Sequence, residues 1–458
     1  MSQSKDNQRK NLKIAFVHPN LGIGGAERLI VDSALGLQKL GHKVVIYTMY
    51  HDEDHCFKET SDAINLINED EDYDLVVVDQ ISAPVPVLKI SSMKVLFYCH
   101  FPDKLQARHD TLLRKFYRLF FDLWEELAMK ESDLILVNSK FTQNVFYKSF
   151  WTISKLPKIL YPGINFDSFD EEVYMDDPEI SEIKDIISPK NSNSETKVLL
   201  SINRFERKKN LSLAIKTFSK VLESKYLNYS KKSDEDSPIP NIVLIMAGGY
   251  DPNMPENVDH LGELIEATKE EKLQYQIIWP STYSSKKYPI SSSNEKSKGI
   301  VLFLPSFSDN VRSYLFKIAT VALYTPENEH FGLVPVESMY MSVPVIAVRS
   351  GGPKETIVDG KTGFLCKSTP EEFSVAVLQI LDIGPKKHSK DALLTPKEMR
   401  LEAHNHAKAR FSLDTFSSKL QECVYEALES GNQLPIVFPI TMLLTSIFIV
   451  IVVYYNSV

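Results

Sequence analysis

The chain has 458 residues, more than one compact core can hold, and suits two domains of roughly 150 to 200 residues each. Hydrophobic residues make up 43% and charged residues 24%, and the net charge of −8 gives no electrostatic reason to expect nucleic acid as a partner. The four cysteines have the spacing of neither a zinc site nor a disulfide framework, so we predict no metal site. They are Cys56, Cys99, Cys366 and Cys423.

The first third of the chain alternates apolar runs with amphipathic segments. The N-terminus has no apolar core before a cleavage site, so we expect no signal peptide. An apolar run, a glycine-rich turn, an amphipathic segment and a β-branched run follow in that order, which predicts a βαβ unit. Later apolar runs end in polar residues, at 73–80, 94–100 and 132–139. We predict a doubly wound, Rossmann-like α/β domain over residues 1–175, with its ligand crevice at the carboxyl ends of the strands.

The same pattern begins again after an acidic stretch. Residues 176–195 are polar and broken by prolines, which predicts a surface linker. Apolar runs then recur at 197–205, 241–249, 299–306, 319–325 and 343–350. They predict a second Rossmann-like domain over residues 196–395, and the periodicity that follows predicts closing helices over 396–433.

The last apolar segment differs from all the others. Residues 434–455 carry no charge and are long enough to cross a hydrocarbon core of about 30 Å, so we predict a transmembrane helix. The alternative is a buried C-terminal core helix, although few soluble helices are apolar on every face for this length. No Lys or Arg stands in the flanks, so the flanking charges do not orient the segment.

Two carboxylates surround a Gly-Pro turn in the second domain. Glu329 and Glu337 stand eight positions apart, and Pro335 suits the start of a helix with Glu337 in its first turn. Each carboxylate can accept two hydroxyl hydrogen bonds, so the pair could hold the hydroxyls of a ribose and a hexose. The alternative is that Glu337 merely complements the helix dipole.

A basic cluster follows the first strand of the second domain, in the stretch NRFERKKN. It contains Arg204, Arg207, Lys208 and Lys209, which offer the planar forks and point charges that a departing diphosphate needs. Such a cluster is also found on ordinary solvated loops. Its place at the crevice edge favours the binding interpretation.

Two further features belong to the first domain. The turn GIGGAE does not match the dinucleotide fingerprint, because Glu27 stands where Gly or Ala is required, but Gly24 and Gly25 would still allow backbone amides to approach a phosphate. His100 ends a strand on the crevice side, where its near-neutral pKa suits work near a sugar hydroxyl. The alternative, which is the more common case for a lone histidine, is a structural role. His18 has a similar location with less support.

Basic and aromatic residues are mixed in two segments, 108–130 and 147–160. Helices of this composition can lie in a membrane interface. Ordinary core packing explains the aromatics equally well, and the predicted C-terminal anchor favours the membrane interpretation.

The motifs EHFGLVPVE, SGGPKETI, DGKTGFL, NRFERKKN and GIGGAE resemble glycosyltransferase family 4 over about residues 12–395. The resemblance implies retaining enzymes of the GT-B fold, with two Rossmann-like domains facing a central crevice. Longer stretches, among them YCHFPDKL, resemble the eukaryotic mannosyltransferases that extend the dolichol-linked oligosaccharide. In many relatives an aromatic is expected where this chain has Leu413, which bears on how the C-terminal helix packs back on the first domain.

That resemblance implies substrates and a location. GDP-mannose would be the donor and Man1GlcNAc2-PP-dolichol the acceptor, with an α1,3 addition followed by an α1,6 addition by one enzyme. The catalytic domains would face the cytosol from the endoplasmic reticulum membrane, in contact with its lipids. Other cytosolic-face mannosyltransferases would be candidate partners.

Roles for single residues are carried over motif by motif. Glu337 would bind the ribose and Glu329 the donor mannose, while Arg204 and Lys209 would neutralise the departing diphosphate. His100 would lie near the reacting sugar. The remaining donor contacts would come from Gly24 and Gly25 in the first domain and from the amides of Phe331, Gly332, Leu333 and Val334 in the second.

Two other functions remain compatible with these residues. The chain could transfer a different nucleotide sugar to another lipid. It could also bind a nucleotide sugar without chemistry, as a scaffold for neighbouring mannosyltransferases, although the intact Glu329, Glu337, Arg204 and Lys209 argue against that function.

Overall fold

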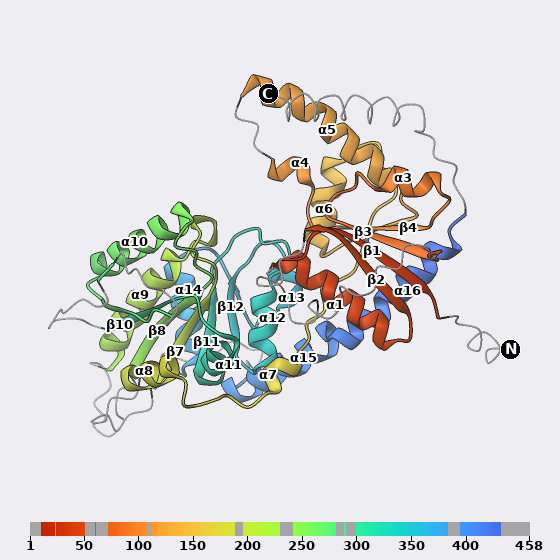
Figure 1. Cartoon of the computed structure of the whole chain (residues 1–458). Coiled ribbons are helices and arrows are strands. Elements are labelled where there is room, and N and C mark those ends of the chain that lie inside the picture. The colour runs from red at the N-terminus through yellow and green to blue at the C-terminus, as the bar shows by residue number, and fades with distance from the viewer. Residues whose placement is uncertain are drawn as a thin grey trace. The chain divides into compact units, whose positions relative to one another are not determined.

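The protein consists of two compact units, seen in a computed structural model (Figure 1). Unit 1 comprises Met1–Asn165 and Phe411–Val458, and unit 2 comprises Phe166–Arg410. The structure describes residues 11–22, 24–50, 60, 72–107, 111–187, 196–229, 241–280, 288–289, 299–382 and 394–431. The segment 434–455, predicted to span a membrane, lies outside these residues, and none of the described helices is long and apolar enough to do so.

Unit 1 is built on a six-stranded parallel sheet of order β2-β1-β3-β4-β5-β6. The chain leaves β1 toward β2 on one side and returns to β3 on the other, so the strand order switches between β1 and β3. Its strands are β1 (Lys13–Asn20), β2 (Lys43–Tyr50), β3 (Leu75–Asp79), β4 (Val95–Cys99), β5 (Leu134–Val137) and β6 (Lys158–Ile159). Its longer helices are α1 (Gly25–Lys39), α3 (Val85–Ile90), α5 (Leu112–Lys130), α6 (Lys140–Ser149) and α16 (Leu413–Glu429), and short helix α4 covers Asp103–Gln106.

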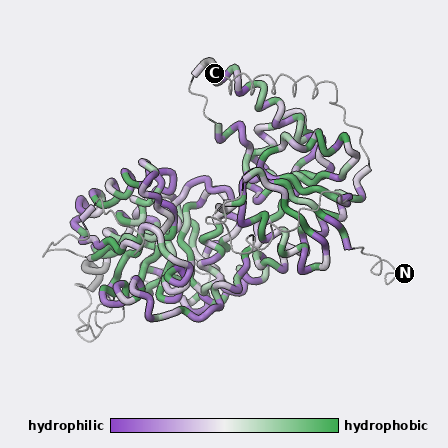
Figure 2. The backbone as a smooth tube through the Cα atoms, viewed as in Figure 1, coloured by the Kyte–Doolittle hydropathy of each residue, from purple (hydrophilic) through white to green (hydrophobic). Residues whose placement is uncertain are grey.

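Helices cover both faces of this sheet because alternate strand residues are apolar on each side. The strands are largely hydrophobic in Figure 2. On one face Ile14, Val77 and Leu96 pack against α1 and α16, and on the other Val76, Phe97 and Ile135 pack against α3, α5 and α6. Helix α16, close to the end of the chain, therefore completes the core of unit 1.

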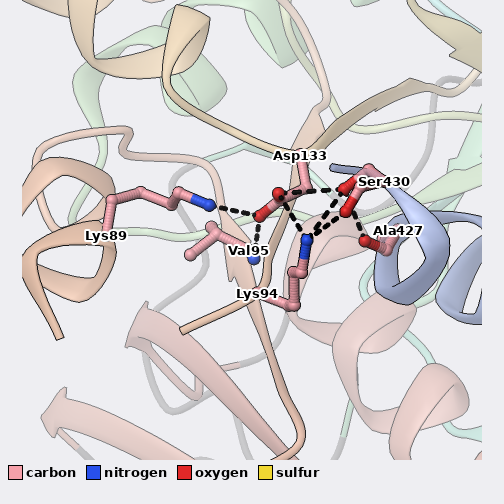
Figure 3. A network of polar contacts seen from close by, with 6 residues as sticks. All are labelled: Lys89, Lys94, Val95, Asp133, Ala427 and Ser430. Carbon is pink, nitrogen blue, oxygen red and sulfur yellow. Dashed lines mark hydrogen bonds and ion pairs between the residues drawn. The ribbon is translucent and has the colours of Figure 1, made fainter. Parts of the chain in front are cut away.

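A buried ionic network fixes the end of α16 to the sheet (Figure 3). Asp133 lies just before β5, and its side chain is 3% exposed. Its carboxylate accepts hydrogen bonds from Lys89 Nζ at 2.7 Å, from Val95 N at 2.8 Å and from Ser430 Oγ at 3.0 Å. Lys94 Nζ also donates to the carbonyl oxygen of Ser430. Burial alone would raise the pKa of Asp133, but the bond from Lys89 and the others hold it below its ordinary value.

We expect Asp133→Ala to lower the free energy of unfolding of unit 1 by about 3 to 5 kcal/mol, because it leaves the buried Lys89 ammonium unpaired. Glu426→Ala is the matched control, since it also removes a carboxylate contact between α16 and the sheet. Its partner Lys158 is exposed, so the cost should stay below about 1 kcal/mol. Denaturant unfolding followed by tryptophan fluorescence would measure both, and equal costs would contradict the stabilising role of the network.

Unit 2 contains a seven-stranded parallel sheet of order β13-β12-β11-β7-β8-β10-β9. Here the strand order switches between β7 and β11. The strands are β7 (Thr196–Ile202), β8 (Asn241–Gly248), β9 (Gln274–Ile277), β10 (Ile300–Pro305), β11 (Ala319–Tyr324), β12 (Val345–Val348) and β13 (Gly363–Cys366). The helices are α7 (Asp167–Asp170), α8 (Pro178–Ile187), η3 (Arg207–Lys209), α9 (Ser212–Tyr229), α10 (Pro255–Glu270), α11 (Asp309–Ile318), α12 (Leu333–Tyr340), α13 (Pro353–Thr356), α14 (Pro370–Ile380) and α15 (Pro396–Phe411).

Two parallel-sheet units confirm the predicted pair of Rossmann-like α/β domains, whereas the predicted transmembrane helix lies outside the described residues. One face of the second sheet packs on α9, α10 and α14. The predicted linker differs from the structure, because part of it forms α8. The isoleucines at 180, 183 and 187 recur at helical spacing and are buried, which outweighs the acidic composition of the segment.

Candidate active site

The candidate residues of unit 2 gather where the strand order of its sheet switches. Lys209 follows β7 on the short turn η3, and Glu329 follows the neighbouring strand β11. Lys209 Nζ lies 2.5 Å from Glu329 Oε2, and the backbone oxygen of Lys209 accepts a bond from Thr325 Oγ1 at 2.8 Å. Two residues far apart in sequence thus form one ion pair at the carboxyl ends of adjacent strands, where open α/β sheets bind ligands.

The Lys209–Glu329 pair is partly shielded from water, with side chains 12% and 23% exposed. Burial would raise the pKa of Glu329, but the positive charge and hydrogen bond of Lys209 hold it below its ordinary value. The carboxylate is therefore ionised and accepts hydrogen bonds only. It can receive a ligand hydroxyl, while the ammonium beside it can attract a phosphate.

Glycines close the loop that carries Glu329. A Cβ at Gly351 would come within 2.3 Å of the Glu329 carbonyl oxygen, and one at Gly352 within 2.3 Å of the Phe331 oxygen. Gly352 N also donates to the Glu329 oxygen at 2.7 Å. Gly332 has a φ of +85° and caps α12, a conformation that other residues rarely adopt. The residues at 331–334 therefore have a backbone fixed by glycine packing.

Glu337 lies deeper in α12 than the sequence predicts. The helix begins at Leu333 rather than at Pro335, because Gly332 supplies the turn, and Glu337 belongs to its second turn. One oxygen pairs with Arg312 of α11. The other, Oε2, is buried and has no hydrogen-bond partner within the described part of the chain. Buried carboxylate oxygens are normally satisfied, so this one is a candidate acceptor for ligand hydroxyls.

The remaining basic residues are arranged by a buried carboxylate that sequence reasoning missed. Glu206 is 6% exposed, and its two oxygens lie 3.0 Å from Arg204 Nη1 and 3.0 Å from Lys208 Nζ. Arg207 turns away and pairs with Glu263 on α10. The structure therefore places Arg204 and Lys208 around Glu206, whereas Arg207 forms an exposed ion pair with Glu263.

In unit 1, Gly24 and Gly25 begin helix α1. A Cβ at Gly24 would lie 2.2 Å from Glu27 Oε2, so the carboxylate of Glu27 folds over the start of the helix. A Cβ at Gly25 would meet nothing within 4 Å. Gly24 thus has a packing role beside Glu27, while Gly25 has open space in front of it.

His100 belongs to a buried cluster at the strand switch of unit 1. Asp79 ends β3, and its Oδ2 lies 2.8 Å from Nδ1 of the buried His18. Its Oδ1 lies 2.8 Å from His100 Nε2, a charge contact whose angle falls short of an aligned hydrogen bond. Glu27 Oε1 lies 3.9 Å from His18 Nε2. Sequence reasoning found the two histidines but not Asp79, whose only signal is a charged residue closing an apolar strand.

The cluster predicts a pH-dependent stability. Burial would lower the pKa of His18, but the hydrogen bond to Asp79 and the nearby negative charges of Asp79 and Glu27 raise it to about 9. Because the pKa of His18 is higher in the folded state, protonated His18 stabilises the folded unit fully below the unfolded pKa of 6.5. This stabilisation is lost as the pH rises through 9. It amounts to about 3 kcal/mol. We expect the unfolding free energy of unit 1 to fall between pH 6.5 and 9, and His18→Gln to remove most of that slope; an unchanged slope would contradict the assignment.

The aromatic segments are not packed into the core as a whole. Phe116 and Phe120 on α5 are 65% and 48% exposed, and Trp151 after α6 is 89% exposed. Exposed lysines accompany them, at Lys115 and Lys148. Other exposed apolar side chains on these segments are Tyr117, Leu119, Leu123, Tyr147 and Leu156. The part of the segment at 108–110 lies outside the described residues.

Comparisons with known families and structures define the class of protein. Residues 23–168 match the family described as Glycosyltransferase Family 4, and residues 182–392 match Glycosyl transferases group 1. A glycosyltransferase from Rickettsia africae has the same fold at 20% identity and a TM-score of 0.61, over 92% of this chain and 100% of that one. Sucrose-phosphate synthase from Thermosynechococcus elongatus matches at 15% identity and a TM-score of 0.60, over 92% and 100%. The protein is a glycosyltransferase of the GT-B fold.

Curated relatives narrow the class to one family. The alpha-1,3/1,6-mannosyltransferase ALG2 of Rhizomucor pusillus is 40% identical, with 91% of this chain and 92% of the relative covered. ALG2 of Mus musculus is 37% identical, over 90% and 95%. The chain belongs to the ALG2 family of alpha-1,3/1,6-mannosyltransferases.

Proposed function

We propose that the chain transfers mannose from GDP-mannose to Man1GlcNAc2-PP-dolichol in an α1,3 linkage and then to Man2GlcNAc2-PP-dolichol in an α1,6 linkage, in N-glycan precursor assembly. The observation that carries the proposal is the 40% identity to an ALG2 mannosyltransferase over 91% of the chain. The ion pair of Lys209 with Glu329 supports it, because it combines a phosphate-attracting cation with a hydroxyl acceptor.

The donor would bind mainly to unit 2. The buried Glu337 oxygen would accept hydroxyl hydrogen bonds from the ribose, and Glu329 those of the mannose. Arg204 and Lys209 would neutralise the diphosphate, and the amides at 331–334 would hold sugar and phosphate oxygens. From unit 1 we assign Gly24 and Gly25 to the diphosphate and His100 to the reacting sugar.

The chemistry would retain the anomeric configuration by front-face substitution. The bond between the mannose anomeric carbon and the diphosphate oxygen breaks, and the bond to the acceptor oxygen forms on the same face. The acceptor's hydroxyl proton passes to the departing diphosphate. Such a step needs no carboxylate nucleophile, and the protein contributes positioning and electrostatic stabilisation of the diphosphate. Within the described residues, no group of three or more His, Cys, Asp and Glu side chains is placed to hold a metal ion.

We place the protein at the endoplasmic reticulum membrane with both units on the cytosolic side. The apolar segment 434–455 supports this location, as do the exposed aromatics of α5 and Trp151. Aromatic side chains with neighbouring lysines suit a surface of anionic lipid headgroups.

We expect these aromatics to bind membranes without the C-terminal segment. In protein ending at residue 431, replacing Phe116, Phe120 and Trp151 by serine should weaken binding to vesicles containing anionic lipid at least about tenfold, because their apolar area no longer enters the interface. Vesicle flotation measures this. Leu401→Ser on α15 is the control, since it removes a similarly exposed apolar side chain from unit 2. Equal flotation of the triple variant and the control would contradict the membrane role.

Donor binding separates this function from its alternatives. In calorimetric titration of the full chain, GDP-mannose should bind at least about tenfold more tightly than UDP-glucose. Tighter binding of UDP-glucose would favour another nucleotide sugar. Binding of GDP-mannose without turnover in the presence of lipid-linked Man1GlcNAc2 would favour the scaffold function.

A further inference from the structure

The His100 residue of unit 1 is held at several points. Its backbone oxygen accepts a hydrogen bond from Asn138 Nδ2 at 3.0 Å, which fixes the position where the chain leaves β4. The ring of the buried Tyr98 lies beside the imidazole, with centroids 4.9 Å apart. The Nε2 atom faces Asp79 at 2.8 Å. The ring's second nitrogen, Nδ1, makes no hydrogen bond within the described part of the chain and is available to a ligand.

The Asp79 carboxylate can determine which nitrogen of His100 carries the proton. Its side chain is fully buried, and burial alone would raise its pKa, yet the contacts with His100 and His18 hold the pKa below its ordinary value. The carboxylate is therefore ionised and can only accept hydrogen bonds. A nitrogen that faces it must carry a proton, and in a neutral imidazole the other nitrogen is then an acceptor.

His18 completes the arrangement from the opposite side. It donates from Nδ1 to Asp79 Oδ2 at 2.8 Å, and its other nitrogen faces Glu27 of α1. A protonated His18 balances the buried negative charge of Asp79 and keeps it ionised. The groups that face Asp79 are thus His18 from β1 and His100 from the end of β4, on the two strands that flank β3.

We propose that Asp79 is a positioning residue that holds His100 with its proton on Nε2, so that Nδ1 accepts a hydrogen bond from a sugar hydroxyl. The inference rests on the proposed role of His100 near the reacting sugar. The contact at Nε2 is short but imperfectly aligned, and hydrogen bonds of this kind tighten when a substrate binds. A histidine with the opposite tautomer would present an N–H where the acceptor is needed, as an incorrectly oriented imidazole does in hydrolases.

The tautomer can be measured without any variant of Asp79. Protein labelled with nitrogen-15 histidine and reconstituted in lipid vesicles would be studied by solid-state NMR at pH 7.5, with the His100 signal assigned from its loss in His100→Gln. We expect an unprotonated Nδ1 and a protonated Nε2. A proton on Nδ1, in either a neutral or a doubly protonated ring, would overturn the proposal, whatever the activity of the enzyme.

A double-mutant cycle tests whether Asp79 acts through His100. Asp79→Asn should lower kcat about 10²-fold with little change in the KM for GDP-mannose, because ring orientation and not donor binding is lost. In a His100→Ala background the same change should lower kcat less than about twofold. An equal loss in both backgrounds would show a merely structural role. Full activity of His100→Ala would instead refute the proposed role of His100, while the NMR result would still decide its tautomer.

Discussion

Replacing Lys209 by methionine is expected to lower the rate of mannosyl transfer by about 10²- to 10³-fold while the protein stays folded. The ammonium lies 2.5 Å from Glu329 and would stabilise the negative charge that develops on the diphosphate. Methionine keeps much of the side chain's volume but has no charge. Steady-state kinetics with GDP-mannose and lipid-linked Man1GlcNAc2 would measure the loss, and a circular dichroism melt would confirm folding.

Arg207→Met is the matched control for Lys209. It removes one positive charge from the same short turn η3, but the guanidinium is about half exposed and paired with Glu263 on α10. Exposed ion pairs contribute little, so transfer should change by less than about twofold. Equal losses in the two variants would indicate that only the general positive charge of the loop matters, which would contradict the specific role of Lys209.

Replacing Glu337 by glutamine is expected to weaken donor binding by about 10- to 100-fold. Its Oε2 atom is buried and has no hydrogen-bond partner among the residues that the structure describes, and we assign to it the hydroxyls of the ribose. Hydrogen bonds to a charged acceptor contribute about 1.5 to 3 kcal/mol, and a neutral amide also removes the carboxylate charge that pairs with Arg312. Calorimetric titration with GDP-mannose and with GDP would both show the loss, because the ribose belongs to the nucleotide.

Glu371→Gln provides the control for Glu337. This glutamate lies on α14, is exposed, and pairs only loosely with Lys220 at 3.3 Å. The affinity of the Glu371→Gln variant for GDP-mannose should match that of the unaltered protein. Unchanged binding of both GDP and GDP-mannose in Glu337→Gln would remove the ribose assignment.

Much of the fold could be predicted because each unit repeats a local pattern. Apolar runs that restart after a polar stretch predict both parallel sheets. Helix α8 was missed because composition dominated the prediction, although the buried isoleucines follow helical spacing. The predicted start of α12 at Pro335 was also wrong. Proline is a common first residue of a helix, but here Gly332 makes the turn and the helix begins at Leu333.

The candidate site was predicted only where its residues stand in motifs. Lys209 and Glu329 are far apart in sequence, yet both follow strands that meet at the switch point, and the structure brings them together. Arg312, Glu206 and Asp79 were missed. Arg312 and Asp79 each support a candidate residue from another element, and such contacts depend on tertiary packing that no local spacing reveals. Glu206 lies within the basic stretch itself, but its burial also depends on tertiary packing.

Incubating the membrane-reconstituted full chain with GDP-mannose and synthetic lipid-linked Man1GlcNAc2, followed by mass and linkage analysis of the released glycan, tests the assigned activity most directly. We predict a product with two added mannoses, one in an α1,3 and one in an α1,6 linkage, and at most about one-hundredth as much product from the Lys209→Met variant at the same enzyme concentration and time. An unchanged acceptor from folded protein, or a glycan with any other linkage, would contradict the proposed function.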